Sequence, residues 1–393
     1  MGLEADSRES AGLPAPLFLG FAVASIGGPL ALSSLYVAGA AGPAIGSAGL
    51  TTLLALVAFL PALAIWLGFS RRIASAGGLY AFVEAAAGPR AASIQAAMWT
   101  VSYFLYLPYT VTYIVYDLLP VVFPGIDPYR WELELAVPVG LVALALAPLA
   151  PVLVAVGALA AGQLLLMAAL GGLELASLGV QSGSFTPSEI GGTATAKGVG
   201  NVSLLFVCGS LPLFLGGEAR GGSRTVRTGL AAAFAIVGAY FVFSAFPLAE
   251  APRAIVAAPV PGVAIAREFA GRPLAIVVGL ATAASVAILI LAEYIALSRL
   301  LRAWLKLRIR GALVLIAIPF LAADALSLIN PQGFYDQLLE PSLVALYLSQ
   351  LLVFAVYPLY RRRPSTLLIA AAASALMIYG LYTVATNQLG LGT

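Results

Sequence analysis

The sequence contains no histidine, the side chain that most often binds metals and shuttles protons near neutral pH. Charged residues are also scarce: they make up 9% of the 393 residues, against roughly 25% in soluble domains. The only cysteine is Cys208, so no disulfide can form within the chain. These absences argue against a soluble domain, a disulfide scaffold and a histidine-based metal site or catalytic centre.

Long apolar runs take the place of the missing charges, because 61% of the residues are hydrophobic. Runs of about 20 apolar residues are typical of membrane-spanning helices. We therefore predict an all-α polytopic membrane protein with about eleven transmembrane helices. The predicted spans are 13–40, 47–69, 92–121, 132–149, 151–178, 199–218, 228–249, 273–303, 311–328, 338–360 and 365–386.

The positions of the basic residues predict the orientation. Lys and Arg are retained on the cytoplasmic side during insertion. With the N-terminus placed inside, only five of the 20 Lys and Arg residues fall outside: Arg130, Lys197, Arg253, Arg267 and Arg272. Residues 1–12 carry no apolar run, so they do not resemble a signal peptide and are expected to form a cytoplasmic tail. We predict a multi-pass protein of the cell membrane.

A linker rich in Gly, Ser and Thr, 179–198, predicts a division into two halves. The segments 13–178 and 199–360 would each hold five helices. Because five is odd, the second half must enter the membrane with the opposite orientation, which is the inverted repeat of the LeuT-type fold. Residues 361–393 would then add an eleventh helix after the repeats.

Two of the predicted spans carry helix-breaking residues near their middle. The first interruption is Ser25-Ile26-Gly27-Gly28-Pro29 in helix one, and the second is Cys208-Gly209-Ser210-Leu211-Pro212 in helix six. Comparable interruptions in the two halves of a chain are the best sequence pointer to a transporter's substrate site. The alternative is a pair of simple kinks, since Gly and Pro are common in transmembrane helices.

Several short motifs resemble those of the amino acid-polyamine-organocation transporters. The most specific lies after helix two, where Gly77-Gly78-Leu79-Tyr80 is followed ten residues later by Gly88. Three other matches are Ile26-Gly27 in helix one, Phe214-Leu215-Gly216-Gly217-Glu218 in helix six and Ser298-Arg299 at the end of helix eight. One departure is Pro29, which stands where the family has a second glycine.

The resemblance implies a secondary transporter for amino acids or related amines, with the substrate at the two interruptions. Amides freed near Gly27 and Gly28 suit a substrate carboxylate. Carbonyls freed in both broken helices suit an ammonium group or a cation. The candidate substrate-binding residues are Ser25, Ile26, Gly27, Gly28, Phe206, Cys208, Gly209, Ser210, Pro212, Phe214, Tyr106 and Tyr109. Simple packing is the alternative for Cys208 and for the two tyrosines.

Three residues are candidates for coupling transport to protons, with sodium as the alternative ion. Glu293 lies in an apolar stretch of helix eight, where a charge has a functional role by default. A structural ion pair with Arg299 or Arg302 is the alternative for it. Glu218 could sense protons or pair with Arg220 or Arg224. Gln163 stands where some proton-coupled relatives have a lysine, and it cannot titrate.

The sequence thus predicts a coupled uptake transporter that works by alternating access, and an uncoupled channel or facilitator is the main alternative. An enzyme is not expected, because nucleophiles and metal ligands are scarce within the spans. The expected partners are a small-molecule substrate and membrane lipids. We expect no cofactor, resident metal or nucleic-acid partner, and the sequence leaves the oligomeric state open.

Overall fold

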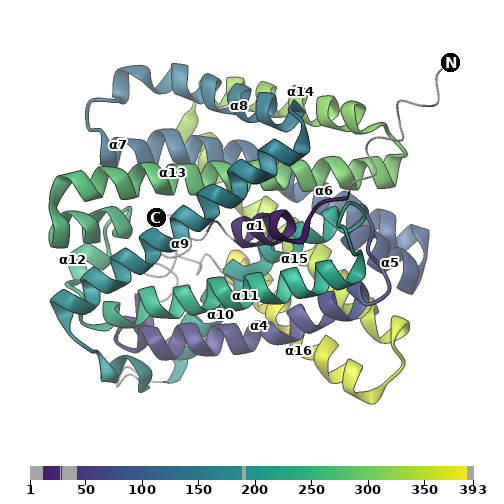
Figure 1. Cartoon of the computed structure of the whole chain (residues 1–393), viewed down its shortest axis with the longest axis horizontal. Helices are drawn as coiled ribbons and strands as arrows, with labels where there is room; N and C mark the ends of the chain where they lie inside the picture. The colour runs from purple at the N-terminus through teal and green to yellow at the C-terminus, as the bar shows by residue number, and fades with distance from the viewer. Residues whose placement is uncertain (1–11, 27, 29–41, 188–191, 387–393) are drawn as a thin grey trace.

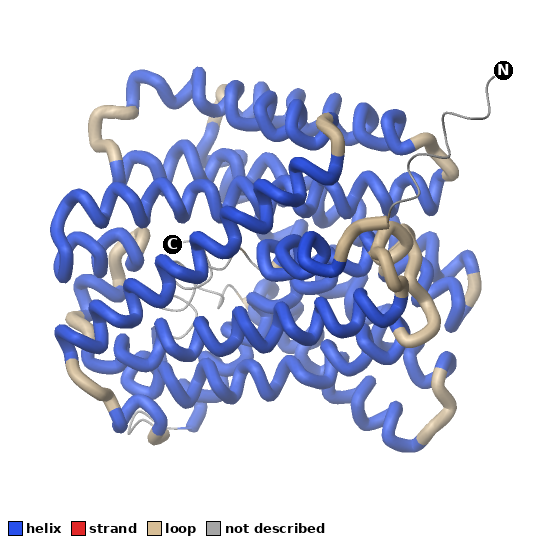
Figure 2. Tube along the Cα trace, in the orientation of Figure 1, coloured by secondary structure: helices blue, strands red, loops and turns tan. Residues whose placement is uncertain are grey.

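The computed structural model describes residues 12–26, 28, 42–187 and 192–386. The all-helical prediction is confirmed for this part of the chain, which has no β-strand apart from one isolated bridge between Leu13 and Ala219 (Figure 2). Among the described residues, nine helical stretches are long and apolar enough to cross a membrane. They are built from α4 (Ala48–Ser70), α6 (Pro89–Thr112), α9 (Leu149–Leu178), α10 (Gly192–Leu204), α11 (Ser223–Ala245), α13 (Pro261–Leu305), α14 (Ile309–Ser327), α15 (Pro331–Tyr360) and α16 (Pro364–Ala385).

The other two predicted spans correspond to shorter helices. The fourth matches α8, Arg130–Leu146, which has 17 residues. The first corresponds to α1, Ala15–Ser25, which has 11 residues and stops at the expected interruption. Residues 29–41, the rest of that predicted span, lie outside the described residues. The eleven-helix count and the inverted repeat therefore stay predictions.

Helix α1 is surrounded by longer helices and lies near the middle of the molecule (Figure 1). It crosses α9 where Gly20 meets Gly157, and a Cβ added to Gly20 would lie 2.8 Å from the Gly157 Cα. On α11, Gly229 leaves room for the fully buried ring of Phe18. Small residues let membrane helices approach closely, so these glycines set how tightly α1 packs.

Helix α13 joins a short helical segment and the predicted eighth span in one bent element. It begins at Pro261 and bends at Gly271, whose backbone has φ +79°. The residues before the bend form the short segment, and those after it form the long apolar span predicted at 273–303. The span ends at Leu305, before Lys306, whose backbone is left-handed.

The glycines of two family-like motifs lie where the loop after α4 packs against the end of helix six. Gly78 has φ +49°, and a Cβ there would lie 2.5 Å from the ring of Phe214. A Cβ on Gly217 would lie 2.8 Å from the amide nitrogen of Ala76. The loop after α4 and the end of helix six therefore meet backbone to backbone, which explains why both motifs require glycine.

Candidate substrate site

Helix one ends at its predicted interruption, whereas helix six stays helical through residues 208–212, and the two segments contact each other. Helix α1 ends at Ser25, and Ile26 leaves the helical conformation with φ −80° and ψ 71°. In helix six, the α-helix α10 changes at Leu205 into the 3₁₀-helix η7, Leu205–Leu215, which includes residues 208–212. The second interruption is therefore a change of helix type and not the break that the sequence predicted. A Cβ on Gly209 would lie 3.5 Å from Ile26 Cγ1, so the two irregular segments are in van der Waals contact. Main-chain groups of both are thus brought to one place.

Gly28, in the first interruption, packs directly against Ser285 of α13. Its backbone has φ +62°, and an added Cβ would lie 2.6 Å from Ser285 Oγ and 2.9 Å from the Ser285 carbonyl oxygen. Ser285 Oγ in turn donates to Gln163 Oε1 on α9 at 3.0 Å. The Gly28 amide donates to the Ala24 carbonyl at 3.3 Å and is not free for a substrate carboxylate in this structure. The predicted site residue Gly27 lies outside the described residues.

The two serines of the site differ in where their hydroxyls point. Ser25 Oγ donates to the Phe21 carbonyl of its own helix at 2.7 Å. Ser210 Oγ donates to the Val207 carbonyl at 3.1 Å and accepts a hydrogen bond from Gln350 Nε2 at 3.0 Å. Within the described residues, Gln350 Oε1 has no hydrogen-bond partner. Ser210 therefore connects the second interruption to a buried amide on α15.

Glu293 on α13 is fully buried, and neither carboxylate oxygen has a hydrogen-bond partner among the described residues. It lies within electrostatic range of the Tyr103 hydroxyl and the Cys208 thiol. The alternative ion pair with Arg299 does not form, because Arg299 pairs elsewhere. An unpaired carboxyl group beside the second interruption can carry a proton or attract a cationic group.

The partner of Arg299 is Glu218. Arg299 Nε lies 3.1 Å from Glu218 Oε1, and Arg299 donates a second bond to Oε2 at 3.4 Å. Glu218 was expected to pair with Arg220 or Arg224, which are near it in sequence. The observed pair instead joins the ends of helices six and eight, and backbone bonds from Leu13 to Glu218 and Arg220 bring in the start of α1.

Removal of this ion pair should open the adjacent end of the molecule. We expect Arg299→Gln to raise the alkylation rate of the native Cys208 by about tenfold or more, because hydrogen bonds to charged groups contribute about 1.5–3 kcal/mol. The rate is measured with a water-soluble maleimide in detergent. The matched control is Arg302→Gln, which changes an exposed residue one turn away. Equal rates in wild type and Arg299→Gln would show that the pair does not limit access.

The aromatic candidates differ in their surroundings. Phe206 packs against Phe59, Phe234 and Phe241, and its fully buried ring belongs to this aromatic core. Phe214 packs on Trp99 with ring centroids 4.5 Å apart.

A tyrosine that was not among the candidates, Tyr103, contacts the second interruption, since its hydroxyl lies 4.0 Å from Cys208 Sγ. The predicted candidates Tyr106 and Tyr109 follow along the same helix and stack on each other, with centroids 5.5 Å apart. The sequence signal that could have selected Tyr103 is its position one turn after Trp99, which brings both rings to the face of α6 that meets helix six.

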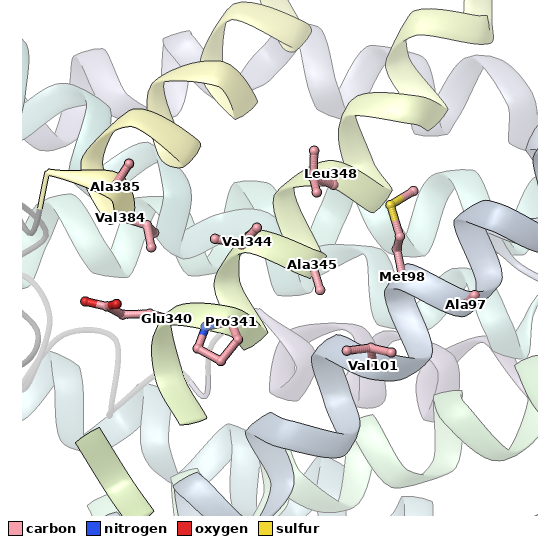
Figure 3. A pocket seen from close by; sticks show the side chains of 10 residues that line it. All are labelled: Ala97, Met98, Val101, Glu340, Pro341, Val344, Ala345, Leu348, Val384 and Ala385. Carbon is pink, nitrogen blue, oxygen red and sulfur yellow. The ribbon is translucent and has the colours of Figure 1, made fainter. Parts of the chain in front are cut away.

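A groove of about 730 Å³ lies elsewhere, between α6, α15 and α16 (Figure 3). Its walls are apolar apart from Glu340, and none of the predicted site residues lines it. The lining residues are Ala97, Met98, Val101, Glu340, Pro341, Val344, Ala345, Leu348, Val384 and Ala385. The groove is thus separate from the two interruptions.

Solved structures of a membrane transporter share this fold. The manganese transporter of Eremococcus coleocola, in complex with an aromatic bis-isothiourea substituted compound, matches 98% of this chain over 88% of its own, with a TM-score of 0.60 and 13% identity. Histidine-to-alanine and glutamate-to-alanine mutants of the same transporter each match 94% of this chain over 92% of their own, with TM-scores of 0.58 and 11% identity. No family model and no curated protein matches the sequence. The fold is therefore that of a multi-pass membrane transporter.

Proposed function

We propose that this chain is a secondary transporter that moves amino acids or related amines across the cell membrane by alternating access. In this proposal its helices form two inverted five-helix repeats followed by an eleventh helix, as in the amino acid-polyamine-organocation transporters. The observation that carries the proposal is the contact between Ile26 and Gly209, which joins the end of α1 to the 3₁₀ segment of helix six next to a buried acid. Irregular backbone at membrane depth is tolerated only where protein covers it or where it lines a cavity.

The chemistry near the interruptions suits a small organic cation or zwitterion. The C-terminal end of α1 carries the negative end of the helix dipole, which favours an ammonium group. Glu293 adds one negative charge when it is ionised and none when it is protonated. Substrate and proton would therefore affect each other's binding through this one side chain, which is the basis of our proposal that transport is proton-coupled. The N-terminus is cytoplasmic in this scheme.

A divalent metal ion is the second candidate substrate, because the matched structures are of a manganese transporter. The residues present give it less support. Within the described residues, no group of three or more His, Cys, Asp and Glu side chains could hold a metal ion. Near the interruptions only Glu293 and Cys208 could supply a charged ligand, and residues 27 and 29–41 contain no acid, cysteine or histidine.

Thermal unfolding of the purified protein in detergent separates the two candidates. We expect one or a few of the twenty amino acids, or a polyamine, to raise Tm in a concentration-dependent way, because a ligand that binds only the folded state stabilises it. Manganese chloride should leave Tm unchanged, with magnesium chloride as the ionic-strength control. Stabilisation by manganese alone would favour the metal instead.

Uptake into proteoliposomes then tests coupling. The amino acid or amine that stabilises the protein should accumulate above equilibrium when a pH gradient, acidic outside, is imposed. A flux that only equilibrates the substrate would identify an uncoupled facilitator. Accumulation driven by sodium at equal pH would identify sodium as the coupling ion.

A further inference from the structure

A second group of buried acids lies away from the interruptions, between helices α8 and α14. These helices run side by side at the edge of the molecule (Figure 1). Glu134 on α8 and Asp324 on α14 are both fully buried. They lie within electrostatic range of each other. The proposed transport mechanism makes no use of either residue.

The two carboxyl groups differ in their hydrogen bonding. Glu134 Oε1 accepts from Thr112 Oγ1 of α6 at 2.7 Å, a shorter bond than the 3.1 Å from the same hydroxyl to the Pro108 carbonyl. Ser327 Oγ of α14 divides its one proton between Glu134 Oε1 at 2.8 Å and the Asp324 carbonyl at 2.7 Å. Three oxygens have no hydrogen-bond partner among the described residues: Glu134 Oε2, Asp324 Oδ1 and Asp324 Oδ2. Because Asp324 and Ser327 are three residues apart on one helix, they share a face, and this places Asp324 beside Glu134.

The charged and titratable groups around the pair do not neutralise it. Tyr116, at the end of helix three, lies within electrostatic range of Glu134 and of Arg130. The Arg130 guanidinium forms its ion pair with Asp127 at 2.8 Å and lies 5.3 Å from the Tyr116 ring centroid. Helix three also carries Asp117. Tyr294, on the adjacent helix α13, donates its hydroxyl proton to the Leu313 carbonyl. Leu313 lies at the opposite end of α14 from Asp324.

We propose that Glu134 and Asp324 form a proton-binding site in which the two carboxyl groups hold one proton between them. The hydrogen bond from Thr112, with the shared one from Ser327, stabilises Glu134 as the ionised member, whereas the Asp324 carboxyl group accepts no hydrogen bond and is the protonated member. Its O–H then donates to Glu134 Oε2, which gives partners to two of the three unpartnered atoms. Two carboxylates that share a site cannot both ionise without strong repulsion.

The site lies close to an end of the molecule. Glu134 is four residues after Arg130, the first residue of α8, and Ser327 is the last residue of α14. Asp127, the exposed partner of half-buried Arg130, marks the surface there, so a proton has about one helical turn to travel. Loss of the proton would place two like charges between α8 and α14 and weaken their packing.

Infrared spectroscopy of the full-length protein tests the site directly. At neutral pH the wild type should show a protonated carboxyl C=O band that shifts in D2O, and Asp324→Asn should lack the part of it that belongs to Asp324. If that variant does not fold, Glu134→Gln serves as the second one: it removes the negative charge that opposes ionisation of Asp324, so the Asp324 component should disappear at a lower pH than in the wild type and shift in frequency. The matched control is Glu132→Gln, two residues from Glu134 on α8, which should retain the wild-type band.

Thermal unfolding gives the second readout. The proton is bound by the folded pair at neutral pH, so the wild-type Tm should fall as pH rises, and Asp324→Asn should remove that part of the dependence. An unchanged infrared band and an unchanged Tm profile in Asp324→Asn would overturn the proposal. An increase in wild-type Tm with sodium or lithium chloride, together with loss of the band, would also overturn it and show that a metal cation neutralises the pair.

Discussion

The variant Glu293→Gln should lose proton-driven uptake completely, down to the rate of protein-free liposomes, while substrate binding or exchange persists. The amide is nearly the same size as the carboxyl group but can neither release a proton nor carry a charge. Because no described residue donates a hydrogen bond to Glu293, the substitution breaks no hydrogen bond that the structure contains. Uptake driven by an imposed pH gradient and counterflow of labelled substrate measure the two activities separately.

Glu174→Gln is the matched control for this experiment. Glu174 is also a buried acid in an apolar helix, 2% exposed, with one unpartnered oxygen. On α9 it lies about three helical turns beyond Gln163, the residue of that helix that binds Ser285. It should retain proton-driven uptake. Unaltered transport in Glu293→Gln would remove Glu293 from the mechanism, and equal losses in both variants would point to a general effect of removing buried carboxyl groups.

Gly28→Ala should be the most damaging of the small substitutions. The left-handed conformation costs about 1–2 kcal/mol for a residue with a Cβ. At Gly28 the new Cβ would also lie 2.9 Å from the Ser285 carbonyl oxygen, which cannot move without bending α13. We expect a lower Tm and loss of substrate-induced stabilisation, both measured by thermal unfolding.

Substitutions at two other glycines distinguish backbone strain from steric crowding as the cause of that loss. Gly88 has φ +84° with open space around its Cβ position, so Gly88→Ala tests strain alone. Gly162 has open space and no positive φ, so Gly162→Ala should be close to neutral. If Gly28→Ala destabilises no more than Gly88→Ala and still responds to substrate, close packing of the first interruption on α13 is not required for binding.

The sequence predicted helices better than it predicted contacts. The span expected at 47–69 is α4, Ala48–Ser70, and the one expected at 365–386 is α16, Pro364–Ala385. Apolar runs determine such boundaries locally, because unpaired backbone groups are too costly in lipid. The same local logic located the interruption after Ser25, where glycine and proline end the helix.

Contacts between distant residues could not be predicted in this way. Glu218 and Arg299 are 81 positions apart, and short-range reasoning assigned Glu218 to its sequence neighbours instead. Glu134 was not singled out, because nothing near it in sequence indicates that Thr112 and Ser327 would donate to it. In each case the choice of partner depends on which helices face each other. Tertiary packing decides this, and the hydropathy of the sequence does not predict it.

The backbone bonds made by Leu13 have a consequence for how the molecule could move. Its amide donates to the Glu218 carbonyl at 2.6 Å, and its carbonyl accepts from the Arg220 amide at 2.8 Å. Two backbone hydrogen bonds thus connect the residue before α1 to the segment that follows η7. While these bonds persist, α1 and η7 cannot move independently of each other during transport. They would instead tilt together as one rigid body, with the hinge at the two interruptions.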